Sequence, residues 1–267
     1  MCKNQIRSII ESIYIIIVSE IPHLLIFKAS NNQIETLNGL QDSNKLKHLQ
    51  ILLLNSNKIK ELIPINLIHL KHLNLSDNEI ASCEKFAGSN SLELLELRKN
   101  KLKNLKGLEN MPMLTELYIA ENELTTIDGL KNIPSLKRLH LRKNAMVKLQ
   151  PIPVLPSLEY LNIRENPIEN SKELINLKML NTLKRISLKG TPPGDEFGDG
   201  AKKELIILLG EYVRFQVVNK AEITKEDIAE ANEEKKERKK KEEESKIEAE
   251  RIAKEQAEQK KEEEVKA

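Results

Sequence analysis

Aromatic residues are scarce in this chain of 267 residues, which contains no tryptophan, four phenylalanines and four tyrosines. Large aromatic side chains usually dominate the energetics of a compact core. A core with so few of them must be built from leucine and isoleucine. Such a composition is unusual for a compact globule and normal for a solenoid, in which each short turn packs only against its neighbours.

Cysteine is also rare, and neither an excess of charge of one sign nor a long apolar run occurs. Cys2 and Cys83 form no CxxC pair and no disulfide framework, which favours a reducing, intracellular setting such as the cytoplasm. The net charge is only +2, which is too small to predict nucleic-acid binding. The apolar run 13–18 is too short to span a bilayer and lacks the flanks of a secretory signal. We therefore expect no nucleic-acid partner and no membrane partner.

The sequence does contain a repeat of the form L-x-x-L-x-L-x-x-N-x-[I/L]. From Asn78 to Asn166 its asparagines recur at a constant interval of about 22 residues, a period typical of stacked repeat proteins. The two intervals before Asn78 depart slightly from this period. Such agreement over successive units identifies an internal repeat. The predicted asparagine ladder consists of Asn32, Asn57, Asn78, Asn100, Asn122, Asn144 and Asn166.

Each unit predicts one turn of an α/β leucine-rich-repeat solenoid. The L-x-L core is a short strand with its leucines facing inward, and the stacked turns form a parallel sheet on the concave wall. The asparagine stands where the chain leaves the strand, and its amide can satisfy backbone groups that the turn leaves unpaired. So short a unit has little room for an α-helix, and convex segments such as 107–112 and 129–134 should therefore be extended or 3₁₀.

This pattern resembles the short-repeat leucine-rich family, whose best-known members are phosphatase-regulating and axonemal proteins. The resemblance covers roughly residues 22–189. It implies the solenoid fold and protein binding, and it implies little more about function, because one fold serves many functions.

The repeats are flanked by two caps and a charged tail. We predict an N-terminal cap or degenerate repeat over 1–21, leucine-rich repeats over 22–190, a C-terminal cap over 191–223 and a charged helical tail over 224–267. At the N-terminus, residues 1–6 are either a degenerate first turn or part of a chain that begins further upstream.

The C-terminal cap is predicted from a change in periodicity. Residues 195–200 should be loop, and residues 201–210 read as an amphipathic helix whose leucines and isoleucine close the core. Val213, Phe215 and Val217 alternate with polar residues and predict a last strand.

The tail begins with Thr224 at the N-cap and Asp227 three residues later, a pattern like a capping box. Acid–base pairs four residues apart, such as Glu234 with Arg238, favour an isolated helix. No large apolar residue occurs between Ala231 and Ile247, so the tail has no coiled-coil seam. A solvated single helix and a docked helix both remain possible.

The strand register identifies the residues that face outward on the concave wall. The early turns present an apolar strip of Ile26, Ile51, Leu53 and Leu94. The later turns present tyrosines and basic residues, which are typical of interface hot spots. The predicted partner-binding residues are Arg98, Tyr118, Arg138, His140, Arg142, Tyr160, Arg164, Arg185 and Lys189. They suit an acidic helix or tail, and the C-terminal helix should contact a second partner.

No catalytic residue, metal site or cofactor is predicted. His23, His48 and His69 each precede the first leucine of a turn and should stack as a surface ladder, without the cysteines or carboxylates of a metal site. No G-x-S-x-G motif, P-loop or Gly-rich dinucleotide motif occurs. We therefore expect a protein that is not an enzyme.

The cap and tail carry a narrower resemblance. The segments KKEL (202–205), YVRF (212–215), VNK (218–220) and ITKED (223–227), followed by the acid–base run 233–241, are similar to leucine-rich-repeat proteins of the ciliary radial spoke. The resemblance implies a non-catalytic scaffold in the spoke head of a motile axoneme, within the cytoskeleton and a large assembly. Two alternatives stay open: a phosphatase regulatory subunit, and an axonemal protein of the dynein light-chain type. The tail argues mildly against both.

Overall fold

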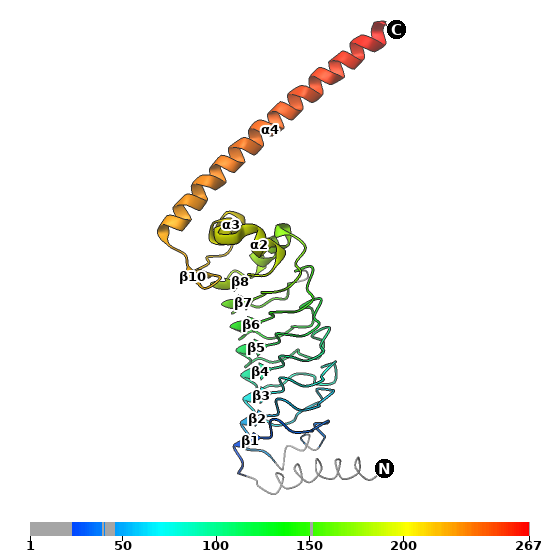
Figure 1. Cartoon of the computed structure of the whole chain (residues 1–267), viewed down its shortest axis with the longest axis vertical. Coiled ribbons are helices and arrows are strands. Elements are labelled where there is room, and N and C mark those ends of the chain that lie inside the picture. The colour runs from blue at the N-terminus through cyan, green and yellow to red at the C-terminus, as the bar shows by residue number, and fades with distance from the viewer. Residues whose placement is uncertain (1–22, 39, 41–45, 150–151, 267) are drawn as a thin grey trace.

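A computed structural model describes residues 23–38, 40, 46–149 and 152–266, with side chains as far as residue 256. The predicted N-terminal cap over 1–21 lies outside these residues. Short strands stack one above another along the long axis, and the connecting segments return on the opposite side (Figure 1). At the C-terminal end a small helical cap closes the stack, and a long helix projects beyond it.

The strands confirm the predicted solenoid. In the described residues, one three-residue strand occurs in each turn: β1 (Ile26–Lys28), β2 (Ile51–Leu53), β3 (His72–Asn74), β4 (Leu94–Glu96), β5 (Glu116–Tyr118), β6 (Arg138–His140), β7 (Tyr160–Asn162) and β8 (Arg185–Ser187). Each strand pairs in parallel with the next, and middle residue lies opposite middle residue, as in Leu95↔Leu117 and Leu117↔Leu139. These middle leucines are fully buried, so the side-chain alternation follows the L-x-L pattern.

The asparagines of the repeat join neighbouring turns through their side chains. Asn100, for example, donates from Nδ2 to the carbonyls of Leu75 (3.0 Å) and Leu97 (3.2 Å), and its Oδ1 accepts from the Ile80 N–H at 2.9 Å. The same three contacts recur at Asn57, Asn78, Asn122, Asn144 and Asn166. Asn32 is exposed and donates only to Ala29 and Ser30, since no described turn precedes it.

The ladder ends at two residues that are not repeat asparagines. Thr191 stands at the asparagine position, is fully buried, and donates its hydroxyl to the Leu188 carbonyl at 2.6 Å. Asn219, from the cap, supplies the missing acceptor, because its Oδ1 accepts from the N–H groups of Leu188 (2.9 Å) and Lys189 (3.2 Å). In the other turns the N–H that corresponds to Leu188 donates to a backbone carbonyl of the next turn, as Ile163 does to Ser187. The Asn219 side chain takes the place of that carbonyl at the end of the sheet.

The secondary structure predicted for part of the cap is wrong. Residues 195–200, predicted as loop, lie in α2 (Pro192–Phe197) and the 3₁₀ turn η2 (Gly198–Gly200). The helix begins because Thr191 accepts at Oγ1 from the Gly194 N–H (3.1 Å) and because Pro192 stands where an N–H is not needed. The predicted helix is present as α3 (Ala201–Leu209), which buries Leu205 and Leu209.

The predicted last strand is also displaced. Val213 and Phe215 are buried, but neither lies in a strand. The strand is β9 (Val217–Val218), which runs parallel to β8 and then turns back into β10 (Ala221–Glu222). The hydrogen bond from the Leu188 N–H to Asn219 fixes the turn after β9 at the end of β8. With the turn in this place, Val218 is buried in the core and Val217 is only half-buried. The convex segment before β8 forms a 3₁₀ helix, η1 (Ser171–Met179).

The tail forms α4 (Lys225–Lys266), which is docked at its start and exposed beyond it. A reciprocal capping box begins the helix: Asp227 donates its N–H to Thr224 Oγ1 (3.2 Å), and Thr224 donates its N–H to Asp227 Oδ2 (2.7 Å). Ala231 is fully buried against the cap, whereas the described side chains of residues 236–256 are exposed. Figure 1 shows α4 leaving the cap beside α3.

Four ion pairs tie the first turns of α4 to the cap. They are Lys202–Asp227 (2.7 Å), Lys203–Glu234 (2.7 Å), Lys235–Glu211 (2.8 Å) and Arg238–Glu204 (2.6 Å). Arg238 also pairs with Glu234 of its own helix. Exposed pairs are weak one by one, and networks with bidentate arginine contribute more. The docking therefore depends on charge more than on apolar burial.

Arg238→Glu is expected to detach the start of α4 from the cap, since it places a third acid beside Glu204 and Glu234. Amide hydrogen exchange over residues 225–238 should become faster, while the strands keep their protection. The matched control is Arg251→Glu, on the exposed part of the same helix, where only pairs within the helix are lost. Unchanged exchange over residues 225–238 in Arg238→Glu would show that the ion pairs do not hold the helix.

Candidate protein-binding surface

The concave wall carries a continuous row of rings and guanidinium groups across five turns, here called the aromatic row: Arg98, Tyr118, His140, Tyr160 and Arg185. The Tyr118 and His140 ring centroids lie 4.3 Å apart, and those of His140 and Tyr160 lie 4.9 Å apart. The guanidinium carbon of Arg98 lies 4.2 Å from the Tyr118 ring centroid, and that of Arg185 lies 5.7 Å from the Tyr160 centroid. Such stacked and cation–π contacts hold side chains in place before any partner binds.

The strand register explains how the row forms. Tyr118 of β5 and His140 of β6 occupy the same repeat position and are direct neighbours in the sheet. Tyr160 of β7 is the direct partner of Arg138, so it meets His140 on the diagonal. Cross-strand neighbours and diagonal neighbours both lie within reach of aromatic side chains. All five residues were expected on this wall, but their stacking into one row was not predicted.

Burial and nearby cations keep the His140 ring neutral. Burial, with a smaller effect from the positive charges of Arg98 and Arg138, lowers the pKa of His140 from 6.5 to about 4, against the opposite effect of Glu116. The pKa of the Tyr118 hydroxyl is raised, first by burial and then by Glu116, to which the hydroxyl donates a hydrogen bond. At neutral pH the row is therefore an uncharged aromatic surface between two arginines.

We expect NMR titration of the His140 ring protons to give a pKa of about 4. Because the unfolded chain binds the same proton near pH 6.5, His140 contributes its full stability above that pH. The contribution is lost as the pH falls toward 4. The ring-proton resonance that disappears in His140→Gln is assigned to His140. Arg98→Gln should raise the pKa of His140, because it removes one nearby cation. A His140 pKa above about 6 would contradict the stacked, buried ring.

The acidic residues of the wall all have basic or amide partners. Glu96 contacts His72 Nε2 at 2.9 Å, accepts from Asn74 Nδ2 at 3.1 Å and lies 3.6 Å from the Arg98 guanidinium. The hydrogen bond from His72 is the main reason that the pKa of Glu96 is lowered. Glu116 lies 3.8 Å from the Arg138 guanidinium. The acidic charge on this wall is therefore compensated within the chain.

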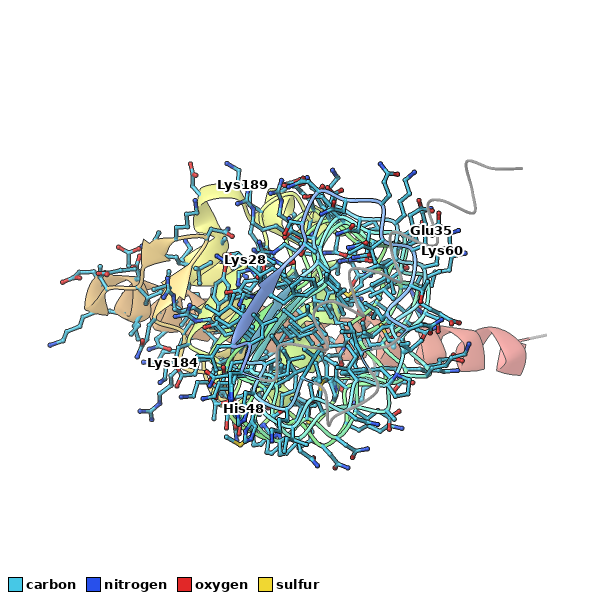
Figure 2. All side chains as sticks on the ribbon, turned by 90° about the horizontal axis from the view of Figure 1, so that it is seen from below. Lys28, Glu35, His48, Lys60, Lys184 and Lys189 are labelled. Carbon is cyan, nitrogen blue, oxygen red and sulfur yellow. The ribbon has the colours of Figure 1, made fainter. Side chains whose placement is uncertain are left out.

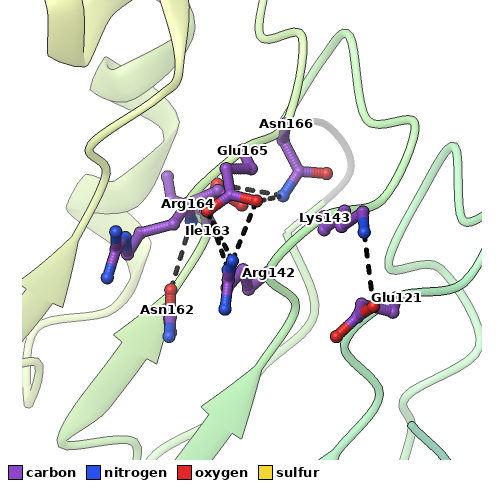
Figure 3. Close-up of polar contacts among 8 residues, drawn as sticks. All are labelled: Glu121, Arg142, Lys143, Asn162, Ile163, Arg164, Glu165 and Asn166. Carbon is purple, nitrogen blue, oxygen red and sulfur yellow. Dashed lines mark hydrogen bonds and ion pairs between the residues drawn. The ribbon is translucent and has the colours of Figure 1, made fainter. Parts of the chain in front are cut away.

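The basic residues divide into a paired group and an unpaired group. Arg142 is held by Glu165 of the next turn, with Nε to Oε1 at 2.8 Å and Nη2 to Oε2 at 3.1 Å (Figure 3). In the part of the chain that the structure describes, Arg164, Arg185 and Lys189 have no acidic partner within ion-pair distance. Arg164 Nε is buried and has no hydrogen-bond partner there. Figure 3 shows the Arg164 guanidinium turned away from Glu165 and Arg142.

The four apolar residues of the early turns do not form a continuous strip. In the sheet, His72 of β3 lies between Ile51 and Leu94, and Asn74 lies beside Leu53. The repeat pattern requires only the inward leucines, so the outward positions of β3 are free to be polar. Ile26, at 46% exposure, is the most open of the four apolar residues, and the other three are half-buried.

A second ladder lies where the chain enters the strands. The predicted stacking of His23, His48 and His69 is confirmed, with centroid distances of 5.6 Å and 6.3 Å. Viewed along the solenoid axis, His48 lies well apart from Lys28 on β1 and from the Glu35–Lys60 pair on the far side (Figure 2). Among the described residues no group of three His, Cys, Asp or Glu side chains could hold a metal ion. No helix in the same residues is long and apolar enough to cross a membrane.

Comparisons with known proteins agree with the solenoid. A family profile described as "Leucine Rich repeat" matches residues 66–82, and no curated protein sequence matches the chain. An internalin (inlF) from Listeria monocytogenes is 20% identical, with a TM-score of 0.53, over 77% of this chain and 64% of the internalin chain. A chain of the LRIM1/APL1C complex is 21% identical, with a TM-score of 0.52, over 63% of this chain and 31% of that chain.

This chain thus spans less than two thirds of the length of both solved structures. At these identities the likeness concerns the fold alone. The chain has the leucine-rich-repeat fold. This conclusion follows from the repeat profile, from the two structural likenesses and from the parallel sheet with one strand in each turn.

Proposed function

We propose that this chain is a non-catalytic scaffold that binds another protein on its concave wall. The observation that carries the proposal is the aromatic row, with uncompensated basic residues at one end. Tyrosine and arginine are enriched at interface hot spots, and rings held in place lose little conformational freedom on binding. The solenoid interior is filled by leucine and isoleucine side chains, which leaves no polar site for chemistry among the described residues.

The partner on the concave wall is an acidic helix or tail. Acidic side chains of the partner would form ion pairs with Arg164, Arg185 and Lys189. Charge complementarity also steers association. A second partner binds α4 beyond its docked turns. The helix from residue 239 to residue 266 would reach about 42 Å at 1.5 Å per residue, and it presents Ile247 at 63% exposure and Ile252 at 42%.

The setting we propose is the motile axoneme, in the head of the radial spoke. The support is the sequence resemblance of the cap and tail, together with a helix that reaches away from the body. A phosphatase regulatory subunit, or an axonemal protein of the dynein light-chain type, remains the second candidate, since either could use the same concave wall. Neither alternative gives the projecting helix a role.

The binding surface is tested by purifying tagged chains and their bound proteins from ciliated cells. Tyr118→Ala with Tyr160→Ala should lose the concave partner, because it removes the rings and leaves the charges. Tyr212→Ala, on the exposed surface of the cap, is the matched control and should keep it. If the double variant keeps every partner and truncation after residue 238 loses them, α4 is the interface and the concave wall is not.

The cellular setting is tested by deleting the gene in a ciliated cell and imaging axonemes by electron tomography. A missing or reduced radial-spoke head, with phosphatase activity unchanged, would support the axonemal proposal. Intact spokes with a mislocalised phosphatase would overturn it in favour of the second candidate.

A further inference from the structure

The two ends of the concave wall differ in chemistry. At the C-terminal end, Arg185 stacks on Tyr160, and Arg164 lies one turn from Lys189, at the same repeat position. None of these three cations has an acidic partner in the described residues, whereas Glu96 and Glu116 toward the other end are paired. Arg164 Nε, buried and without an acceptor, is a donor that the chain itself leaves unused.

The opposite end offers apolar contact on β2 and β4, with the polar His72 and Asn74 of β3 between them. Ile51 and Leu53 of β2 and Leu94 of β4 face outward and are half-buried. An apolar side chain of a partner would cover them, and a carboxylate there would meet the paired acid Glu96. Lys28 of β1, beside Leu53, is a cation without an acidic partner in the described residues, against three such cations at the C-terminal end. An acidic segment placed over this end would therefore be disfavoured relative to the C-terminal end.

The distance between the ends sets the length of the segment. Six strand spacings separate β2 from β8, or about 29 Å at about 4.8 Å per spacing. An α-helix of about 20 residues spans the same length. The aromatic row lies between the ends and runs across the strands, along the solenoid axis.

We propose that the concave wall binds one amphipathic, acidic protein segment with a defined polarity. The segment lies along the solenoid axis, with carboxylates over Arg164, Arg185 and Lys189 and apolar side chains over β2–β4. The inference rests on the proposed function and adds the composition and direction of the partner. Guanidinium groups bind carboxylates with two parallel hydrogen bonds, and stacking on Tyr160 holds Arg185 in place for that contact.

The probe is a synthetic helical peptide of about 20 residues, with leucines in one half and glutamates in the other. A photo-reactive group is attached at either end, and its cross-links to the full chain are mapped by mass spectrometry. We expect the glutamate end to cross-link to the turns of β7 and β8 and the leucine end to those of β2–β4. A peptide with the two halves exchanged should bind in the opposite chain direction, with its glutamates in the same place.

Charge-reversal variants test the residues. Arg164→Glu with Arg185→Glu should weaken peptide binding by about tenfold or more. Lys106→Glu with Lys131→Glu makes the same change in net charge beside a depression of the opposite surface and should stay within about twofold. Thermal melts of both variants check that the solenoid remains folded. If the charge reversal unfolds it, the binding measurement is made with Arg164→Gln and Arg185→Gln instead.

The result separates this inference from the proposed function. Absent binding, equal loss in the two charge-reversal variants, or glutamate cross-links on β2–β4 would each overturn the polarity. If cellular partners still depend on Tyr118 and Tyr160 in that case, the scaffold function stands and only the polarity fails. If they do not, the concave wall is not the binding surface.

Discussion

Asn144→Ala is expected to lower the free energy of unfolding by about 1–3 kcal/mol, the range for leaving a buried hydrogen-bonding group without its partner. Asn144 is buried at 8% exposure. Its Nδ2 donates to the carbonyls of Ile119 (3.1 Å) and Leu141 (2.9 Å), and its Oδ1 accepts from the Leu124 N–H at 3.1 Å. The side chain thus joins two successive turns at the point where both leave the sheet.

The neighbours of Asn144 limit the loss. The Ile119 carbonyl also accepts from Asn122 at 3.2 Å, and the Leu141 carbonyl also accepts from Asn166 at 2.9 Å. Both carbonyls therefore keep one hydrogen bond in the alanine variant. The buried Leu124 N–H loses the acceptor that Oδ1 provides, so this donor accounts for most of the effect.

Asn144→Asp separates the donor from the acceptor. It keeps an oxygen for the Leu124 N–H but points a carboxylate at two carbonyl oxygens, so it should destabilise more than alanine at neutral pH. Urea unfolding followed by circular dichroism measures all variants. Asn90→Ala, at an exposed asparagine, should stay within about 0.5 kcal/mol of the parent. Equal unfolding midpoints for Asn144→Ala and the parent would show that the ladder does not stabilise the solenoid.

A chain that ends at Gly190 is expected to lose cooperative unfolding and to aggregate, because the end of the solenoid core is then open to water. The cap covers this end with buried apolar side chains: Leu205, Leu209, Val213, Phe215 and Val218. Fully burying one such side chain contributes roughly 1.5–3 kcal/mol. The cap also closes the sheet, since Gln216 donates its N–H to the Lys184 carbonyl at 2.7 Å.

The control for this truncation is a chain that ends at Lys239. It keeps the cap, the buried Ala231 and all four ion pairs between α4 and the cap, and it loses only the part of α4 beyond the docked turns. Its melting temperature should match that of the full chain. A soluble Gly190 truncation with the melting temperature of the parent would show that the repeats are stable without their cap, contrary to the usual need of solenoids for a capping unit.

The repeat itself was the most predictable feature, because one local pattern specifies it. The inward leucines, the outward positions and the asparagine at each strand end follow from a strict alternation along each strand within a short, recurring unit. A shift of one residue would move every leucine to the surface, so the register is strongly determined. The capping box at Thr224 and Asp227 is equally local, and both of its hydrogen bonds are present.

The ends of the solenoid were less predictable, because single residues replace the repeat there. Thr191 both completes the ladder and begins α2, and Asn219 supplies the last acceptor from 31 residues away from Leu188. No spacing rule connects Asn219 with Leu188, so the position of β9 could not be read from the alternation of valines. Likewise, the docked turns of α4 depend on charges in α3 and at Glu211, which lie 24 to 34 residues earlier in the chain.

The sequence by itself determined the parallel solenoid, its register and the set of side chains on the concave wall, because those follow from periodic burial. Only the tertiary structure decided how these side chains pair. Arg142 is occupied by Glu165, whereas Arg164 has no acidic partner in the described residues, although both arginines stand at the same repeat position. The stacking of Tyr118, His140 and Tyr160 is decided in the same way. The physical reason is that side-chain torsions and the offset between turns set these distances of a few ångströms, and the repeat pattern constrains neither.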